Sequence, residues 1–233
     1  MKPFNTLFYF FMGCTLFFCA CNSVSNNNEL KATDSLLTLP FFNQPDWTPE
    51  WINETDTGYN DIHTIPSFSF LDQNGKVIDE NLVNGKIYIA NFFFTKCRNI
   101  CPKMTNNMYL LQEAFKNDTS ILLLSHSVTP ETDNINVLHK YALNNKVDAK
   151  KWHLLTGNKK EIYGLAKQQY FAGDTVGYYQ SGNEFLHTEN FILVDQYRRI
   201  RGVYNGTLLV EINRIKEDIL LLKSEMASIV KLK

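Results

Sequence analysis

Apolar and polar positions follow two different periods along the chain, and these periods predict an order of strands and helices. Two apolar runs without polar alternation, 86–94 and 120–128, are typical of strands that are buried on both faces. Asn74-Gly75 lies between two shorter strand-like runs and indicates a hairpin. The short strands are expected over 67–71, 76–79, 152–155, 190–195 and 200–204.

Apolar residues three or four positions apart predict helices over 102–116, 133–144, 159–170 and 207–231. We interpret the stripe in the first helix as core-facing rather than metal-binding; it comprises Met104, Met108, Leu111 and Phe115. The predicted buried face of the last helix comprises Leu208, Ile212, Ile215, Ile219 and Leu222.

Strands alternate with helices, and the chain ends in a strand pair followed by a helix. This order predicts an α/β fold of thioredoxin-like type, with a central mixed sheet flanked by helices. An N-terminal hairpin precedes the sheet, and a second hairpin precedes the C-terminal helix. The domain is expected over 40–233, and its first part, 40–62, is expected to be an irregular arm packed on the rest.

The first residues have the pattern of an export signal. Lys2 provides a basic start, and the apolar stretch 7–20 is too short to span a bilayer. Small residues followed by Cys21 resemble the lipobox of bacterial lipoproteins. We expect a signal peptide over 1–20, a lipid on Cys21 and a flexible linker over 21–39, so that the protein is exported and membrane-anchored, facing the periplasm. An ordinary secretory signal is the alternative.

Charge and cysteine content narrow the chemistry. With 23 Lys and Arg against 24 Asp and Glu the net charge is −1, so no basic surface for nucleic acid is expected. Three of the five cysteines lie in the signal or at its end. Cys97 and Cys101 are therefore the cysteines expected in the folded domain.

Cys97 and Cys101 follow the predicted strand 86–94 and precede a helix that starts at Pro102. Redox pairs of thioredoxin type are spaced Cys-x-x-Cys, and the extra residue here favours a soft metal ion. Residues at i and i+4 of a helix have Cβ atoms about 5–6 Å apart, whereas a relaxed disulfide needs about 3.8 Å. We therefore expect a disulfide to require strain. The helix start beside Cys101 favours a thiolate.

His187 is the candidate third ligand, because it lies just before the predicted strand 190–195. Thioredoxin-like redox enzymes usually carry a proline there, and no proline occurs between Ala172 and Asp195. Two thiolates and an imidazole suit copper as Cu(I) and as Cu(II). An open zinc site is the rival, and copper is favoured by its higher intrinsic affinity. The remaining histidines are interpreted as surface or satisfied core residues: His63, His126, His139 and His153.

From His63 to the C-terminus the sequence resembles the Sco/SenC family of copper-binding proteins, which are membrane-anchored thioredoxin-fold factors for cytochrome c oxidase assembly. The resemblance rests on Cys97-x-x-x-Cys101-Pro102, Ser127–Asp133, Trp152–Gly157, Ile162–Ala166 and His187-Thr188.

The resemblance implies that Cys97, Cys101 and His187 bind copper. It also implies that the protein delivers copper to the dinuclear centre of oxidase subunit II or a similar copper-site protein, or reduces the thiols of that centre. Leu186 and Thr129 depart from the family pattern, because the family usually has Asp at both positions. A copper chaperone is expected rather than an enzyme.

The alternative is an exported thiol–disulfide oxidoreductase that acts through Cys97 and Cys101 without a metal, with a thiol reductase as a further candidate partner. Both roles are compatible, because thiols must be reduced before a metal enters them. A peroxidase of peroxiredoxin type is disfavoured, since no Pro-x-x-x-Thr-x-x-Cys pattern precedes Cys97.

Overall fold

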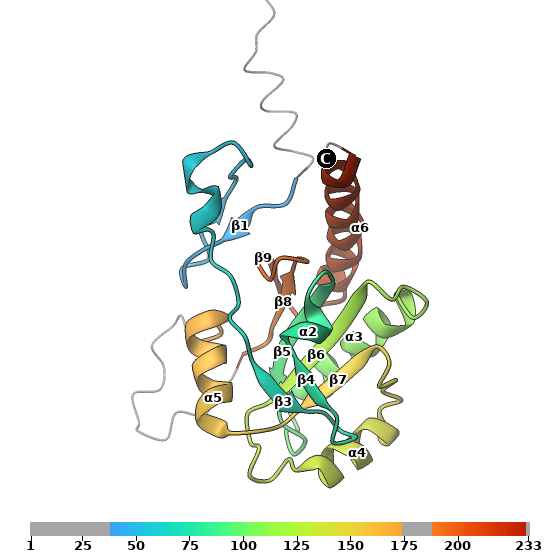
Figure 1. The fold of residues 1–233 in the computed structure, drawn as a ribbon. Helices are drawn as coiled ribbons and strands as arrows, with labels where there is room; N and C mark the ends of the chain where they lie inside the picture. The colour runs from blue at the N-terminus through green and yellow to red at the C-terminus, as the bar shows by residue number, and fades with distance from the viewer. Residues whose placement is uncertain (1–37, 174–187, 232–233) are drawn as a thin grey trace, which may run out of the picture.

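The computed structural model describes residues 38–173 and 188–231, with side chains up to 227. Its centre is a five-stranded sheet in the order β7-β6-β5-β8-β9 (Figure 1). Strands β5 (Ile87–Phe93), β6 (Ile121–Ser127) and β7 (Trp152–Leu155) are parallel, whereas β8 (Asn190–Val194) runs antiparallel to both β5 and β9 (Ile200–Asn205). The predicted mixed sheet is therefore confirmed.

The strand directions decide which loops meet. The parallel strands and β9 all end at one edge of the sheet, and β8 begins there, because Asn190 is paired with Asn205. We call this the carboxyl edge; it comprises the ends at Phe93, Ser127, Leu155 and Asn205 and the start at Asn190. Ligands of open α/β sheets bind at such edges.

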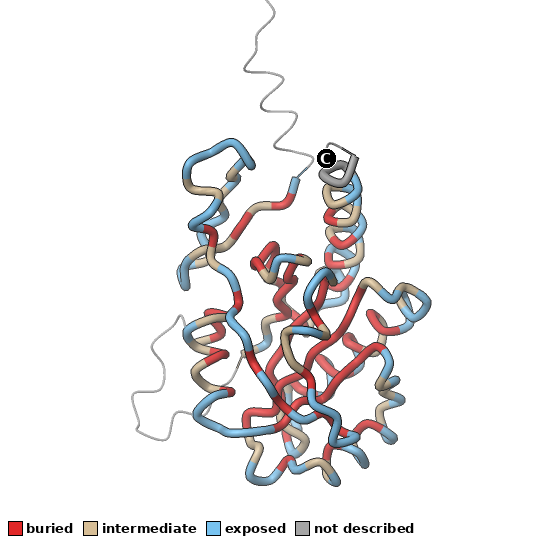
Figure 2. The backbone as a smooth tube through the Cα atoms, viewed as in Figure 1, coloured by how far each residue is buried: buried red, intermediate tan, exposed pale blue. Residues whose placement is uncertain are grey.

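Alternate side chains of the buried strands enter two separate cores. Ile87, Ile89 and Phe93 of β5 belong to a core with α3 (Cys101–Ala114), α4 (Ile135–Asn144) and α6 (Leu209–Lys231). Tyr88, Ala90 and Phe92 belong to the other core, with α5 (Lys159–Gly164), α2 (Glu80–Val83) and the hairpin β3 (Ser69–Leu71)–β4 (Val77–Asp79). Every residue of β5 and β6 is buried, as the apolar runs predicted, and Figure 2 shows the strands at the centre of the sheet in red.

The expected elements are present within a few residues of their predicted ends. The Asn74-Gly75 turn joins β3 to β4, and Gly75 has a φ of 74°, which a side chain would oppose. Met104, Met108 and Leu111 are fully buried, so the core-facing interpretation of that stripe is confirmed. The predicted α6 face is wrong at one position, because Leu208 lies in the turn before the helix and is half exposed.

Helix 159–170 was also expected to be continuous. The α-helix ends at Gly164 and continues as a wider π-type turn, η2 (Leu165–Gln169), because the Tyr170 N–H donates to the Leu165 carbonyl. The wider turn carries the Tyr170 side chain into the core, where its hydroxyl is hydrogen-bonded to that of Tyr88 at 3.1 Å.

The arm over 40–62 is more regular than expected. It contains a short ladder of β1 (Phe41–Phe42) and β2 (Pro49–Glu50) and the 3₁₀ helix η1 (Thr57–Asp61). Arg201 of β9 donates to the Leu39 and Pro40 carbonyls and pairs with Glu225 of α6 at 2.7 Å. Leu39 thus belongs with the arm rather than with the expected linker. None of the described helices is long and apolar enough to cross a membrane.

Candidate functional site

The two cysteines lie together at the carboxyl edge. Cys97 is in the turn between β5 and α3, where its N–H donates to the Phe94 carbonyl at 3.2 Å. Cys101 is the first residue of α3, and Pro102 follows it in the first turn, as expected. Both are free thiols, and 8% and 3% of their surfaces are exposed, respectively. Cys97 is therefore the more accessible sulfur.

The premise of the predicted obstacle to a disulfide does not hold. Cys97 precedes the helix, so the spacing of i and i+4 residues within a helix does not apply to this pair. The Cys97 and Cys101 side chains lie close enough for each thiol to shift the pKa of the other. The described geometry is therefore compatible with metal binding and with thiol–disulfide exchange.

The two sulfurs have opposite electrostatic environments. Burial raises the pKa of the Cys97 thiol, but hydrogen bonds from the Cys101 thiol and from the backbone around Asn99 and Ile100 outweigh it, so the pKa lies below its ordinary value. Burial, the hydrogen bond to Cys97 and the charge of Cys97 raise the pKa of Cys101 to about 12. Cys97 is thus the more acidic sulfur of the pair and Cys101 the less acidic one.

A buried carboxylate, Asp133, holds the cysteine-bearing loop. It accepts hydrogen bonds from the Thr95 N–H at 3.1 Å and from the Thr95 hydroxyl at 2.6 Å. The hydroxyls of Ser127 and Thr129 donate to the same carboxylate, at 2.7 and 3.0 Å. Because Thr95 lies two residues before Cys97, Asp133 links the end of β6 to the position of the sulfur.

The Asp133 contacts also give the Thr129 departure a physical meaning. Thr129 donates its hydroxyl hydrogen to Asp133, and its N–H donates to the Ser127 hydroxyl oxygen at 3.1 Å. An Asp at position 129 would place a second carboxylate beside the fully buried Asp133, which is costly without a cation. Threonine provides a donor at this point instead. Leu186, the other departure, lies outside the described residues.

We expect Asp133→Asn to destabilise the fold by about 2–4 kcal/mol, because an amide presents N–H groups to the donors that the carboxylate now accepts from. Chemical denaturation checks this loss. Asp148→Asn is the control, since Asp148 is exposed and its side chain accepts from the Lys150 N–H; a change below about 1 kcal/mol is expected there. Equal losses in the two variants would contradict the special role of Asp133.

Tyr141 of α4 is a member of the site that the sequence did not indicate. Its hydroxyl is hydrogen-bonded to the Thr105 hydroxyl of α3 at 2.7 Å. Burial raises the pKa of Tyr141 and outweighs the hydrogen bond to Thr105, which lowers it; electrostatic interaction with the nearby cysteines raises the pKa further. A protonated phenol therefore lies near the sulfurs. The position of Tyr141 depends on how α4 packs on α3, and no local sequence pattern indicates that packing.

His187 and Cys21 lie outside the described residues. Within 38–173 and 188–231, no group of three or more His, Cys, Asp or Glu side chains is arranged to hold a metal ion. The described part of the chain therefore supplies two sulfur donors. Strand β8 starts at Asn190, three residues after His187, and it starts at the carboxyl edge.

The interpretation of the other histidines is confirmed for three of them. His63 is hydrogen-bonded to the Gln169 carbonyl, His139 to the Asn74 side chain, and the buried His153 to Asp72 at 3.1 Å. The interpretation as a surface or satisfied core residue is wrong for His126, which is fully buried in β6 and has no hydrogen-bond partner for either ring nitrogen among the described residues. The sequence did indicate the burial of this histidine, because position 126 falls within a strand predicted to be buried on both faces.

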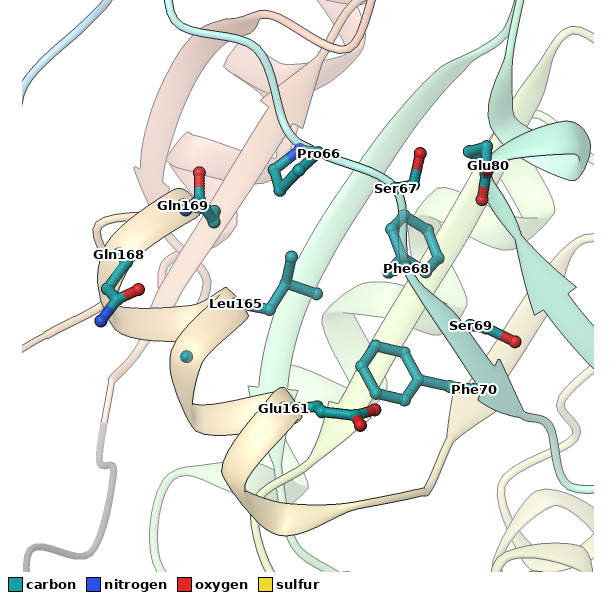
Figure 3. A pocket seen from close by; sticks show the side chains of 11 residues that line it. Pro66, Ser67, Phe68, Ser69, Phe70, Glu80, Glu161, Leu165, Gln168 and Gln169 are labelled. Carbon is teal, nitrogen blue, oxygen red and sulfur yellow. The ribbon is translucent and has the colours of Figure 1, made fainter.

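A pocket of about 500 Å³ lies away from the cysteines, between residues 66–70 and the α5–η2 segment (Figure 3). Phe68, Phe70 and Leu165 provide its apolar lining, and Glu80 and Glu161 its charges. Phe68 and Phe70 also contact His126, with ring centroids 6.2 and 5.7 Å away. The pocket thus borders the core around His126 rather than the sulfur site.

Sequence comparison decides the family. Residues 56–220, which include both cysteines and His187, match the family described as SCO1/SenC. The chain belongs to the SCO1/SenC family. A curated relative, the SCO1 protein homolog of Bacillus subtilis, is 32% identical over 146 residues, which are 62% of this chain and 75% of that protein.

Solved structures of SCO1/SenC proteins confirm the thioredoxin-like fold. A SCO1/SenC family lipoprotein from Bacillus anthracis is 29% identical, with a TM-score of 0.61, and the match covers 69% of this chain and 95% of that one. BsSco, a member of the Sco family of cytochrome c oxidase assembly proteins in which a disulfide switch was identified, is 28% identical, with a TM-score of 0.57 over 69% and 94% of the two chains.

Proposed function

We propose that this SCO1/SenC protein carries copper on Cys97, Cys101 and His187 and serves the assembly of cytochrome c oxidase. The observation that carries the proposal is the pair of adjacent, buried free cysteines at the carboxyl edge, of which Cys97 has a pKa below its ordinary value. Soft sulfur donors suit Cu(I), and an imidazole suits Cu(II). Copper is the cargo, which the protein takes up and releases.

The comparisons support this proposal through proteins of the same family. BsSco is a cytochrome c oxidase assembly protein. Yeast Sco1, whose structure was solved with copper bound, is 21% identical and at that distance shows only a common fold. We propose oxidase subunit II, or a similar protein with a copper site, as the recipient of the copper.

Copper titration tests the ligand set. We expect the chain from Asn22 onward to bind one equivalent of Cu(I) without oxygen, and Cys97→Ser and Cys101→Ser each to lose tight binding. His187→Ala is expected to lower copper affinity at least ~10-fold, because one donor is removed. His139→Ala is the control, since His139 is exposed and distant from the sulfurs in sequence. Unchanged affinity in His187→Ala would remove the histidine from the site.

A second candidate function is favoured by the electrostatic asymmetry of the cysteines. A low-pKa thiolate beside a high-pKa thiol is the arrangement of a thiol–disulfide reductase, in which one sulfur attacks and the other resolves. The same pair would reduce the thiols of a copper site before copper is inserted. We propose that it does both.

We also propose that the protein is exported and attached to the membrane by a lipid on Cys21, facing the periplasm. The structure of the Bacillus anthracis relative, a lipoprotein of the same family, supports this proposal. Mass spectrometry of the mature protein is expected to show a lipid-modified N-terminal cysteine; an unmodified terminus after cleavage elsewhere would contradict it.

A further inference from the structure

The exposed surface around the cysteines is positively charged. Lys96 and Arg98 flank Cys97, Lys103 follows Cys101 by two residues, and all three cations are exposed. Within residues 38–173 and 188–231, none of the three forms an ion pair. We call Lys96, Arg98 and Lys103 the cationic rim.

The described acidic side chains near the carboxyl edge are not ion-paired with this rim. Glu131 is paired with Lys159 at 3.3 Å, and Glu211 with Arg214 at 3.0 Å. Glu189 accepts from the Asn205 side chain, and Asp133 is buried. The segment 96–103 thus carries three cations and no acidic residue, on a chain whose net charge is −1.

An apolar surface lies next to the rim. Leu208, Leu209 and Val210, at the start of α6, are 48%, 61% and 65% exposed. Together they expose apolar side chains at the start of α6. We call these residues the apolar step.

A buried hydrogen bond fixes the apolar step beside the rim. The Asn107 side-chain amide of α3 donates to the Gly206 carbonyl at 2.7 Å. Lys103 lies four residues before Asn107, so the two share one face of α3. The apolar step begins two residues after Gly206. The apolar step therefore starts close to the face of α3 that carries Lys103.

We propose that the cationic rim and the apolar step are the docking surface for a client protein whose cysteine pair is flanked by carboxylates and bordered by apolar side chains. Any partner that reacts with Cys97 brings its own sulfurs between Lys96 and Arg98. Carboxylates beside those sulfurs would then face the rim, and opposite charges raise association rates by about 10–10³-fold at low salt. The inference deepens the proposed function and rests on a client that exchanges thiols or copper with this pair.

The exchange step balances without another reagent. The Cys97 thiolate attacks one sulfur of the client disulfide, and the other client sulfur leaves as a thiolate. The Cys101 sulfur then gives up its proton to that thiolate and attacks Cys97 in the mixed disulfide. This attack breaks the bond between Cys97 and the client, and the second client sulfur leaves as a thiolate. The products are a Cys97–Cys101 disulfide and a reduced client pair, one sulfur as thiol and one as thiolate, so two electrons pass from this chain to the client.

Rates of thiol exchange with three disulfides test the rim. The probes are a peptide with an internal Cys-x-x-x-Cys disulfide flanked by Asp, the same peptide with Asn in place of Asp, and the neutral hydroxyethyl disulfide. We expect a triple variant of the reduced full chain, Lys96→Glu/Arg98→Glu/Lys103→Glu, to reduce the disulfide of the Asp peptide at least ~10-fold more slowly at low salt. The effect is expected to shrink at high salt and to be absent for the two neutral probes.

Two outcomes would overturn the role of the rim. Equal slowing of all three disulfides would mean that the cations act on the Cys97 thiolate rather than on a partner. An unchanged rate with the Asp peptide would mean that the cations affect neither the thiolate nor the partner. The matched control is Lys150→Glu, an exposed lysine just before β7, at the opposite edge of the sheet. It is expected to leave all rates unchanged.

The apolar step is tested with a folded probe, the soluble copper-site domain of an oxidase subunit II with its cysteines joined in a disulfide. We expect Leu209→Ser/Val210→Ser to slow its reduction by about 3–10-fold and to leave the hydroxyethyl disulfide unaffected. Leu143→Ser is the control, because Leu143 is 68% exposed on α4. Equal rates of reduction of the subunit II domain by the two variants would overturn the role of the apolar step in docking.

Copper titration of the same variants separates this inference from the proposed function. Failure of the unsubstituted chain to bind copper would overturn the carrier function, and the exchange rates would still decide the docking surface. Normal copper binding with rates that are insensitive to the rim would overturn the docking surface alone.

Discussion

Cys97→Ser is expected to abolish thiol–disulfide exchange, whereas Cys101→Ser is expected to keep the first step and to trap a mixed disulfide. The reason is the division of roles between the two sulfurs. Cys97 has a pKa below its ordinary value and the larger exposure, and the pKa of Cys101 is raised to about 12. The thiolate is the nucleophile in exchange, so attack begins at Cys97.

The expected loss in Cys97→Ser is on the order of 10³-fold or more in the rate of the first step, because the nucleophile itself is removed. Anaerobic stopped-flow measurement with a chromogenic disulfide gives this rate for both variants. Mass spectrometry is expected to detect the mixed disulfide on Cys97 in Cys101→Ser. A trapped adduct on Cys101 in Cys97→Ser, formed at the same rate, would reverse the assignment.

The second large effect concerns His126, whose imidazole lies in an aromatic environment. Its ring is stacked on Phe92 with centroids 5.3 Å apart, and Phe68, Phe70 and Tyr170 complete the surroundings. Neither ring nitrogen has a hydrogen-bond partner in the described part of the chain. Burial alone lowers the pKa of His126 to about 3.

This lowered pKa makes stability depend on pH in a defined direction. The unfolded chain binds a proton at His126 below about pH 6.5, whereas the folded chain binds it only near pH 3. The free energy of unfolding is therefore expected to fall as pH decreases through this window, by roughly 4–5 kcal/mol in total. Above about pH 6.5 the contribution is fully present.

We expect His126→Phe to flatten this acid limb and, at pH 7, to raise the free energy of unfolding by about 1–3 kcal/mol, because two unpartnered buried nitrogens are removed. Urea denaturation at several pH values measures both effects. His126→Leu is a second, smaller substitution that separates the loss of the nitrogens from crowding by the larger ring.

His139→Leu is the control for exposed histidines and is expected to leave the acid limb unchanged, since His139 is exposed. His153→Leu is expected to destabilise, because Asp72 would stay buried without its imidazole partner. An acid limb that is as steep in His126→Phe as in the unsubstituted chain would show that other groups carry the pH dependence.

Much of the fold was predictable because it follows from local periodicity. The runs 86–94 and 120–128 lack polar alternation, which indicated strands covered on both faces, and β5 and β6 are buried throughout. The departures occur where a tertiary contact outweighs the local pattern. The π-type turn at Leu165 carries Tyr170 to Tyr88, and Leu208 is displaced from the α6 face because the chain turns at Asn205.

The sequence by itself determined that Cys97 and Cys101 follow a buried strand and open a helix, because strand, spacing and Pro102 are consecutive in the chain. It also identified the family, through motifs spread from Cys97 to His187. The helical spacing that was applied to Cys97 and Cys101 does not hold, because Cys97 lies before α3. The strand pattern predicted that His126 is buried but did not indicate that its ring nitrogens lack a hydrogen-bond partner among the described residues.

Only the tertiary structure decided what surrounds the sulfurs. Thr95 is hydrogen-bonded to Asp133 across 38 positions of sequence, and Asn107 to Gly206 across 99. Such contacts fix the cysteine loop and bring the apolar step beside the cationic rim. Hydrogen bonds and charges act through short distances in space, and the packing of β6 and α6 against α3 creates those distances; the order of residues along the chain does not.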